Sequence, residues 1–348
     1  MSTFHKLSIK NRIQETATAV SIVFDVPENL KENFSFKAGQ YTTLQANING
    51  EEVRRAYSIC SSPKSGELKV AIKAVENGTF SVYATSQLKV GDVLEVHEPE
   101  GKFILAPAKS KNYLGFAAGS GITPVLSMVK AVLQEEPTSS FTLIYGNKSE
   151  EETIFKSELE ALSEEYSSRF NLHYIFSKQN VDGSLFGRID AAYTNYYVKN
   201  IYKNWTFETA FLCGPEEMIK IVSETLKENR FKESQILFEL FTASIDEENV
   251  SQIKDGETEV TVLLDDEEFS FTMKQTSDIL AAALRNDIDA PYSCQGGVCS
   301  SCLGKVTEGT AIMTKNSILT DAEVKDGFIL TCQAHPTTSK ISIDYDDV

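Results

Sequence analysis

Residues 291–302 read PYSCQGGVCSSC and place cysteines at positions 294, 299 and 302, and a fourth, Cys332, follows 29 intervening residues later. Iron–sulfur clusters are held by four cysteine thiolates, and two bridged irons need this number of sulfur donors. Gly296 and Gly297 let the backbone curl closely around such a cluster and present amides to its sulfurs. We therefore predict a [2Fe–2S] site whose ligands are Cys294, Cys299, Cys302 and Cys332.

A structural zinc site is the alternative for these cysteines. Zinc ribbons usually use two C-x2-C pairs, and this chain has only the pair Cys299 and Cys302. Residues 291–302, together with LTCQ at residues 330–333, resemble the cluster loop and the distal ligand segment of plant-type ferredoxins. The resemblance implies an α+β (β-grasp) ferredoxin domain over residues 258–348.

The composition is that of an ordinary globular protein of two or three domains, with 348 residues of which 41% are hydrophobic. The net charge of −17 repels polyanions, so we expect neither nucleic acid nor a membrane surface as a partner. Residues 258–348 hold 15 Asp and Glu against 6 Lys and Arg. This acidic stretch predicts either a solubilising face or a docking surface for a basic partner protein.

Two features predict a cytoplasmic protein. Residues 1–20 lack the apolar core of a signal peptide, and clustered cysteines in such a chain favour metal or redox chemistry over disulfides. Residues 112–129 carry no formal charge, but their glycines and Pro124 predict a buried strand, a turn and a helix start rather than a membrane span.

The first part of the chain, residues 1–107, predicts an antiparallel β-barrel. Short β-rich runs recur there and are separated by Gly, Asn and Pro. The runs cover residues 19–26, 41–46, 68–74 and 93–96.

Residues 108–241 alternate between strand and helix patterns, which predicts an α/β domain with a parallel sheet. Strands are expected at residues 113–117, 141–145, 171–176 and 207–212, and helices from Thr123, at residues 154–162 and at residues 216–226. We expect Thr123 to cap its helix and Pro124 to occupy the first helical position.

Residues 242–257 are polar and aperiodic, which predicts a linker. A hairpin around Asp265 and Asp266 should follow, and then a helix at residues 276–285 capped by Thr276 or Ser277. We hypothesise that the linker lets the last domain swing between a flavin and an electron acceptor.

Residues 55–58 read RAYS and follow GQY at residues 39–41. They resemble the R-x-Y-S/T signature of the ferredoxin–NADP reductase family, which implies a flavin site made by Arg55, Ala56, Tyr57 and Ser58. Arg55 offers a charged fork to a pyrophosphate, Tyr57 offers a ring for stacking, and Ser58 acts as a catalytic residue near the flavin N5 atom. A core tyrosine without a ligand is the alternative.

In that family a second phosphate contact follows one hairpin later. Small residues and amides at a helix N-terminus hold phosphate, so the resemblance assigns this contact to Gly78, Thr79, Phe80 and Ser81, with Lys73 lining the same site. A capped helix without a ligand is the alternative.

Residues 119–124 read GSGITP and resemble the family's nicotinamide-dinucleotide loop. Glycines admit a pyrophosphate and the helix N-terminus attracts it. The implied contacts are Gly119, Ser120, Gly121, Thr123 and Pro124. The family's C-G-P segment corresponds to Cys213, Gly214 and Pro215, with Met218 beyond it, and implies that Cys213 orients the nicotinamide for hydride transfer. A buried strand-end thiol is the alternative for Cys213.

Cations near the adenosine 2′ position favour NADPH over NADH. Ser177, Lys178 and Arg188 resemble family positions that hold a 2′-phosphate, so we expect NADPH, with plain surface charges and NADH as the alternative. The segment FELF at residues 238–241 resembles the end of the reductase module, which makes Glu239 a candidate catalytic contact.

The order of barrel, nucleotide domain and ferredoxin resembles that of oxygenase reductases, a class that includes the phenylacetyl-CoA epoxidase reductase. The class implies an oxidoreductase that moves electrons from NADPH or NADH through FAD to a [2Fe–2S] cluster. The acceptor would be an oxygenase component with a di-iron or Rieske centre. FMN instead of FAD, a stand-alone NADPH–ferredoxin-type reductase serving a desaturase, and a redox-sensing binding protein are the alternatives.

Overall fold

The computed structural model describes residues 4–106, 110–241 and 245–348. The chain divides into two compact units, one formed by residues 4–239 and the other chiefly by residues 240–348. No helix within the described ranges is long and apolar enough to cross a membrane.

The larger unit begins with an antiparallel sheet of order β4-β3-β6-β1-β2-β5. A bridge between Ile59 and Val70 joins the segment after β4 to β5, and the amide of Cys60 donates to the carbonyl of Lys69 at 2.8 Å. The sheet thus closes into the expected barrel. Its strands are β1 (Phe4–Thr16), β2 (Ala19–Asp25), β3 (Tyr41–Ile48), β4 (Glu51–Ser58), β5 (Leu68–Lys73) and β6 (Val93–His97).

Apolar side chains of the barrel strands point inward and form a core that includes Leu7, Ile22, Leu44 and Val70. Helix α1 (Thr79–Ser86) adds the buried Phe80 and Ala84 to this core. Short 3-10 turns η1 (Glu28–Leu30) and η2 (Pro63–Ser65) lie in the connections.

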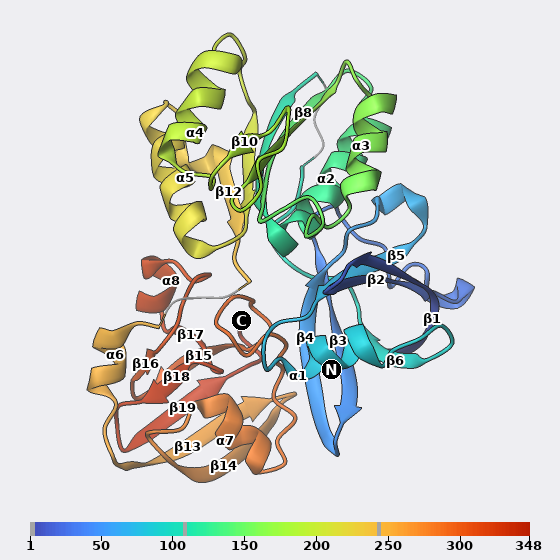
Figure 1. Ribbon diagram of the computed structural model, residues 1–348. Coiled ribbons are helices and arrows are strands. Elements are labelled where there is room, and N and C mark those ends of the chain that lie inside the picture. Colours follow the sequence, from blue (N-terminus) through green and yellow to red (C-terminus); the bar gives the residue numbers. More distant parts are fainter. Residues whose placement is uncertain (1–3, 107–109, 242–244) are drawn as a thin grey trace. The chain divides into compact units, whose positions relative to one another are not determined.

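The second part of the larger unit is a parallel sheet of order β10-β9-β8-β7-β11-β12. Helices α2 and α3 cover one face and α4 and α5 the other (Figure 1). Its strands are β7 (Asn112–Ala118), β8 (Ser140–Asn147), β9 (Phe170–Phe176), β10 (Leu185–Phe186), β11 (Thr209–Cys213) and β12 (Ile236–Glu239). The helical segments are η3 (Gly119–Gly121), α2 (Ile122–Glu135), α3 (Lys156–Glu165), α4 (Ala191–Asn195), η4 (Tyr196–Ile201), α5 (Glu216–Glu228) and η5 (Glu233–Gln235).

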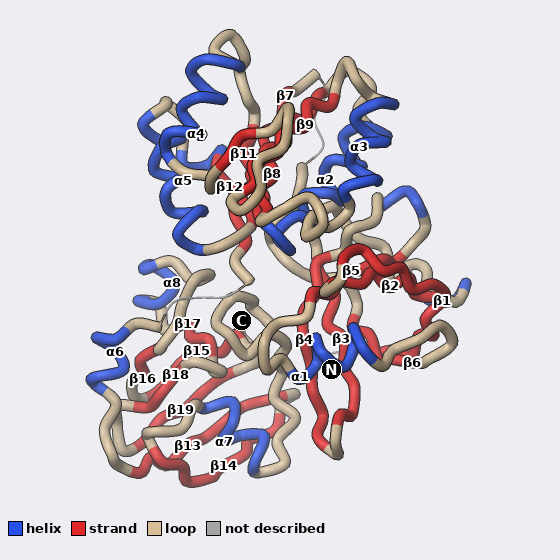
Figure 2. Tube along the Cα trace, viewed as in Figure 1, coloured by secondary structure: helices blue, strands red, loops and turns tan. Residues whose placement is uncertain are grey.

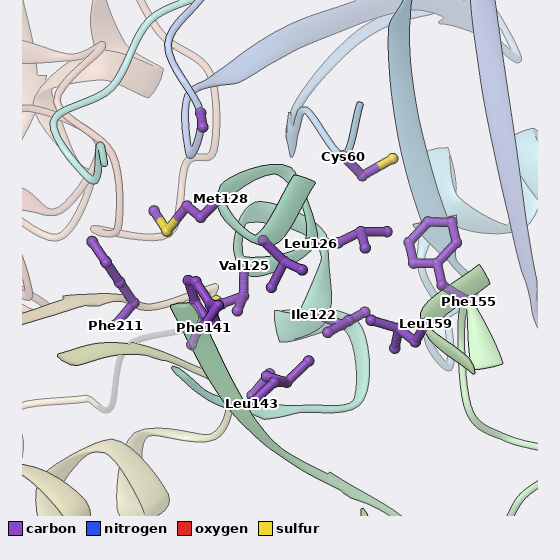
Figure 3. Close-up of a cluster of buried hydrophobic side chains, with 14 of the residues drawn as sticks. Cys60, Ile122, Val125, Leu126, Met128, Phe141, Leu143, Phe155, Leu159 and Phe211 are labelled. Atoms are coloured by element: carbon purple, nitrogen blue, oxygen red, sulfur yellow. The ribbon is translucent and has the colours of Figure 1, made fainter. Parts of the chain in front are cut away.

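One continuous apolar core joins the barrel to the parallel sheet. It contains Ala38, Cys60 and Phe103 from the barrel side together with most of the buried face of α2. Phe103 packs edge-on against Phe211 of β11, with ring centroids 5.9 Å apart. Figure 3 shows side chains of this core on both sides of α2. Barrel and sheet are therefore packed as one body.

The smaller unit holds a five-stranded sheet of order β14-β13-β19-β15-β17 and a two-stranded sheet of β16 and β18. Strands β13 and β19 are parallel, and β13 and β14 form the expected hairpin, with Asp265 at φ 54° and Asp266 at φ 62° in its turn. The strands are β13 (Glu257–Leu264), β14 (Glu267–Lys274), β15 (Leu303–Glu308), β16 (Ala311–Met313), β17 (Phe328–Leu330), β18 (Ala334–Pro336) and β19 (Lys340–Asp344). The helices are α6 (Glu247–Gln252), α7 (Ile279–Arg285) and α8 (Asp321–Lys325).

Residues 242–257, which the sequence predicts to be a linker, contain helix α6. Asp246 caps α6, and its amide donates to the carbonyl of Thr314 at 2.8 Å. Asn249 donates to the carbonyl of Met313 at 2.9 Å. These contacts hold α6 against the smaller unit; residues 242–244 lie outside the described residues.

Two expected helix caps are also corrected. Helix α2 begins at Ile122 with Gly121 as its cap, and the Thr123 hydroxyl donates to the Ser120 carbonyl at 3.0 Å, so Pro124 lies beyond the first position. Helix α7 is capped by Asp278, whose carboxylate accepts from the Ala281 amide at 2.8 Å. In α7 the Asp278 carboxylate satisfies a free amide of the first turn, whereas Gly121 makes no side-chain bond to α2.

Candidate active site and cofactor sites

The four residues of the RAYS motif lie at the end of β4, where the strand reaches the parallel sheet. Ser58 is buried, while Arg55 and Tyr57 are partly exposed. Burial raises the pKa of Tyr57 well above its ordinary value, so its phenol is neutral. The Tyr57 ring lies 5.7 Å from the ring of Phe80 in α1. The fold therefore brings the two flavin motifs predicted from the sequence into contact.

The N-terminus of α1 is built as a close-fitting backbone cradle. A Cβ on Gly78 would lie 2.4 Å from the Ser81 hydroxyl and 2.5 Å from Val75 Cγ2, so a side chain there would have to displace both groups. The Ser81 hydroxyl accepts from the Val75 amide at 3.2 Å. The side chain of Ser81 is therefore engaged, and its backbone amide is the group that can face a ligand. Within the described chain no side chain caps this helix end, so the first-turn amides are suited to a phosphate.

Lys73 ends β5 and pairs with Ala19 of β2, a few residues before this cradle. It forms no ion pair with any described residue. Its ammonium can therefore serve an anion bound at the α1 cradle.

The expected dinucleotide loop lies at the point where the order of the parallel strands reverses. Strand β7 is followed by Gly119–Gly121 and its neighbour β11 is followed by Cys213 and Gly214. Nucleotides bind at such switch points, outside the carboxyl ends of the strands. Gly119 has φ +55°, and its carbonyl accepts from the Tyr145 hydroxyl at 2.9 Å.

The two loops at the switch point touch. A Cβ on Gly121 would lie 2.1 Å from the carbonyl oxygen of Cys213, so any larger residue would push the loops apart. A Cβ on Gly214 would lie 2.7 Å from Met218 Cε. Pro215 caps α5 without a side-chain bond. The residues predicted on both loops are thus brought together beside the N-termini of α2 and α5.

Three predicted catalytic residues converge beside these loops. The Ser58 hydroxyl donates to Glu239 Oε2 at 3.0 Å, although 181 residues separate them. Glu239 ends β12 and pairs with Cys213 at the end of β11. Burial, and then the charge of Glu239, raise the pKa of Cys213 far above its ordinary value. The cluster consists of a hydroxyl, a carboxylate and a neutral thiol.

The expected 2′-phosphate residues gather at another part of the same sheet edge. Ser177 and Lys178 follow β9, and Arg188 follows β10, which runs parallel to β9. The Lys178 amide donates to the Lys148 carbonyl at 2.9 Å, which fixes the start of this loop. Lys178 and Arg188 are exposed, so their charges are available to a phosphate.

The cluster cysteines form two pairs of thiols. They lie in the loop between α7 and β15, drawn without helix or strand in Figure 2, and just after β17. Hydrogen bonding from Cys299 lowers the pKa of Cys294 to about 7, and hydrogen bonding from Cys302 lowers that of Cys332. No three metal-binding side chains of the described residues surround one ion position. Two thiols for each of two irons is the donor arrangement a [2Fe–2S] cluster requires.

The backbone around these thiols fits a cluster. The Gly296 amide donates to Cys294 Sγ at 3.3 Å, and the amide of Gly297 hydrogen-bonds to Cys332. Such bonds from amides to sulfur tune an iron–sulfur centre. Gly297 has φ +72°, and its Cβ would lie 2.9 Å from the Lys315 carbonyl oxygen.

Sequence reasoning missed Gln333 as a functional residue. Its side-chain amide donates to the carbonyl of Gln295 at 3.0 Å and to that of Cys332 at 2.8 Å. Gln333 therefore fastens the short cysteine loop to the strand end that carries the distant cysteine. The only available signal was its place next to Cys332.

Three features together define the class of protein: a flavin cradle on a barrel, a dinucleotide loop on a parallel sheet, and paired thiols in a third domain. The protein is an NAD(P)H-dependent flavin and iron–sulfur oxidoreductase.

Comparison with known proteins gives the family. Models of an oxidoreductase FAD-binding domain, an oxidoreductase NAD-binding domain and a 2Fe–2S cluster-binding domain match residues 6–104, 116–224 and 262–337. The chain is 40% identical to one of the subunits of 1,2-phenylacetyl-CoA epoxidase from Escherichia coli, covering 99% of both chains. It is 31% identical to the ferredoxin reductase component of 3-ketosteroid-9-alpha-monooxygenase of Rhodococcus rhodochrous, covering 97% of this chain and 96% of that one.

Among solved structures, phthalate dioxygenase reductase matches with a TM-score of 0.67 and 24% identity, over 98% of both chains, and shares the fold. The chain belongs to the family of oxygenase reductase components that combine FAD, NAD(P)H and a [2Fe–2S] cluster. Reductase components of this kind transfer electrons to an oxygenase partner.

Proposed function

We propose that this chain is the reductase of an oxygenase of the phenylacetyl-CoA epoxidase type, acting in the cytoplasm. It takes a hydride from NADPH and sends single electrons through its cluster to a partner with a di-iron or Rieske centre. The 40% identity to the Escherichia coli epoxidase protein over nearly the whole chain supports this partner. A bound flavin would accept two electrons from NADPH and pass them one at a time to the cluster.

The observation that carries the proposal is the convergence of Ser58, Cys213 and Glu239 at the switch point. The Ser58 hydroxyl donates its hydrogen bond to Glu239, so the lone pairs of its oxygen remain available to accept from a ring nitrogen of the flavin. Glu239 and Ser58 together form a short path for a proton. Burial keeps the Cys213 thiol neutral, and this thiol would fill space beside the nicotinamide.

The four thiols support the second half of the proposal. Gly296 and Gly297 aim amides at the sulfurs of Cys294 and Cys332, which favours the more negative, reduced state of a cluster. Plant-type clusters have reduction potentials of about −400 mV, low enough to reduce many oxygenase metal centres.

The test begins with the purified holoprotein mixed with NADPH without oxygen. Flavin absorbance should fall first, and the electron paramagnetic resonance signal of a reduced [2Fe–2S] cluster should follow. The reduced protein is then offered the oxygenase components of phenylacetyl-CoA epoxidase, 3-ketosteroid-9-alpha-monooxygenase and glycine betaine monooxygenase.

We expect substrate turnover only with the phenylacetyl-CoA component. Faster turnover with another component would reassign the partner. Fast reduction of cytochrome c without substrate turnover by any of the three oxygenase components would favour a stand-alone reductase. Failure of NADPH to reduce the flavin would contradict the proposal altogether.

A further inference from the structure

Helix α2 carries two buried polar side chains on the side that meets the barrel. Ser127 is fully buried and Lys130 is 8% exposed. The Ser127 hydroxyl donates to the carbonyl oxygen of Ser61 at 2.7 Å, and Lys130 Nζ donates to that of Cys60 at 3.1 Å. Because residues three apart share a helix face, the two side chains hydrogen-bond to adjacent peptide units of the barrel.

The two peptide units that accept these hydrogen bonds directly follow the flavin motif. Cys60 and Ser61 come two and three residues after Ser58, the last residue of β4. Helix α2 in turn starts directly after Gly119–Gly121, the dinucleotide loop. The contacts therefore tie the backbone that presents Ser58 to the helix whose N-terminus would hold the nicotinamide dinucleotide.

A partly buried ion network supports these two contacts. Glu158 of α3 places Oε1 2.5 Å from Lys130 Nζ and Oε2 3.4 Å from Lys69 Nζ. Lys69 of β5 also lies 3.7 Å from Glu15 of β1 and 4.8 Å from the ring centroid of Phe155. Two ammonium groups and two carboxylates thus balance one another across two barrel strands and two helices.

Apolar contacts along α2 stabilise the same interface. The helix buries Leu126 and Met128, and Cys60 joins the same apolar core, as Figure 3 shows. Replacing buried ion pairs by apolar residues is often neutral or stabilising, because charges lose their hydration on burial. The hydrogen bonds of Ser127 and Lys130 add a fixed geometry between α2 and the segment after β4.

We propose that Ser127, Lys130 and Glu158 are positioning residues for hydride transfer. They hold β4 and α2 at the spacing that the flavin and the nicotinamide need. This inference rests on the proposed function. Hydride transfer is sensitive to such spacing, since a misplacement of about 1 Å can cost roughly 100-fold in rate.

The experiment compares flavin reduction by NADPH in the full-length holoprotein and in Ser127→Ala and Lys130→Met. Anaerobic stopped-flow mixing at saturating NADPH measures the limiting rate. We expect this rate to fall roughly tenfold in Lys130→Met and roughly threefold in Ser127→Ala, as displacements below 1 Å would give. The kinetic isotope effect with deuterated nicotinamide should rise, while flavin content and the dissociation constant for NADP⁺ stay unchanged.

A matched control tests whether any contact between barrel and sheet domain would behave in this way. Lys64 of the barrel pairs with Glu135 of α2 at 3.5 Å, but its side chain is 68% exposed. Lys64→Met should keep the wild-type rate, and Lys130→Arg, which retains a donor, should recover part of it.

Wild-type rates and isotope effects in Ser127→Ala and Lys130→Met would overturn the inference. If Lys130→Met binds no flavin, Ser127→Ala decides by itself. A wild-type protein whose flavin NADPH does not reduce would instead contradict the proposed function.

Discussion

Gly297 and Gly296 are adjacent, yet the structure gives them different roles. Gly297 has φ +72°, and a Cβ there would lie 2.9 Å from the Lys315 carbonyl oxygen. A Cβ on Gly296 would meet nothing closer than the Cys294 carbonyl oxygen at 3.7 Å. Backbone obstruction and a left-handed conformation together make Gly297 specific for glycine.

We expect Gly297→Ala to lose most of its cluster and Gly296→Ala to keep it. The alanine at position 297 must strain the loop by about 1–3 kcal/mol, because its conformation is sparsely populated for residues with a Cβ. Cluster content is measured as iron and sulfide per protein and, independently, as the visible absorbance of the cluster. Equal cluster content in the two variants would show that the loop adapts to a side chain at position 297.

Ser58 and Glu239 should matter for the rate of flavin reduction more than for binding. Glu239→Gln keeps the shape of the side chain but removes the carboxylate that accepts the Ser58 proton. Positioned proton-transfer groups contribute about 10²–10⁴-fold, and because this pair acts beside a hydride transfer we expect the lower end, about 100-fold. Stopped-flow reduction with NADPH measures it.

Glu208→Gln is the control for the Glu239 experiment. Glu208 is an exposed carboxylate of the same unit, which pairs with Lys111 at 2.6 Å away from the catalytic cluster. It should leave the rate unchanged. A slow Glu239→Gln protein with a proportionally weakened NADP⁺ complex would point to binding rather than to the chemical step.

At the scale of elements, the parallel pairing of β9 and β10 would let two residues ten positions apart bind one phosphate, as we predict for Lys178 and Arg188. Lys178 follows β9 and Arg188 follows β10, and both are exposed. We expect the double variant Lys178→Ala with Arg188→Ala to raise the KM for NADPH at least tenfold. A hydrogen bond to a charged group contributes about 1.5–3 kcal/mol, which corresponds to that change.

The KM for NADH is the internal control, because NADH lacks the 2′-phosphate. Steady-state reduction of cytochrome c with each nucleotide measures both constants. Parallel losses with NADH and NADPH would mean that the two residues support the loop rather than read the phosphate.

Elements whose signals are local could be predicted from the sequence. Strand patterns gave β2, β3 and β8 within a few residues, and the glycines of residues 119–121 marked the switch point. Helix α6 was missed because its partners, the carbonyls of Met313 and Thr314, lie more than sixty residues away.

The same limit applies to the sites. Motifs named Ser58 and Glu239 separately, but only the fold joins them across 181 residues. Lys130 lies in a plain helical pattern, and no local signal marks its bond to Cys60. Contacts between side chains and distant carbonyls depend on packing, which a single sequence does not display.

At the scale of the whole molecule, charge sets the pH range over which the larger unit is stable. Burial opposes the charge on Glu158, but Lys130 and Lys69 outweigh it and lower the pKa of its carboxyl. The free energy that Glu158 contributes to folding is therefore present above its ordinary pKa of about 4.3 and is lost as the pH falls through its lowered value. Burial likewise opposes the charge on Lys69, yet its neighbours, Glu158 and Glu15 among them, raise its pKa, so its contribution is complete below about 10.4.

We therefore expect the melting temperature of the larger unit to fall as the pH is lowered from neutral through 4, and Glu158→Gln to remove part of that fall. At neutral pH the variant should melt lower than the wild type, by about 2–4 °C for each kcal/mol lost. The gap should close in acid, where the wild-type carboxyl is protonated as well. Release of flavin fluorescence on heating reports this unit alone, and Glu135→Gln, whose partner Lys64 is exposed, is the control. A gap that stays constant from neutral pH to 3 would mean that Glu158 stabilises the unit by packing, because a stabilising charge must disappear with its proton.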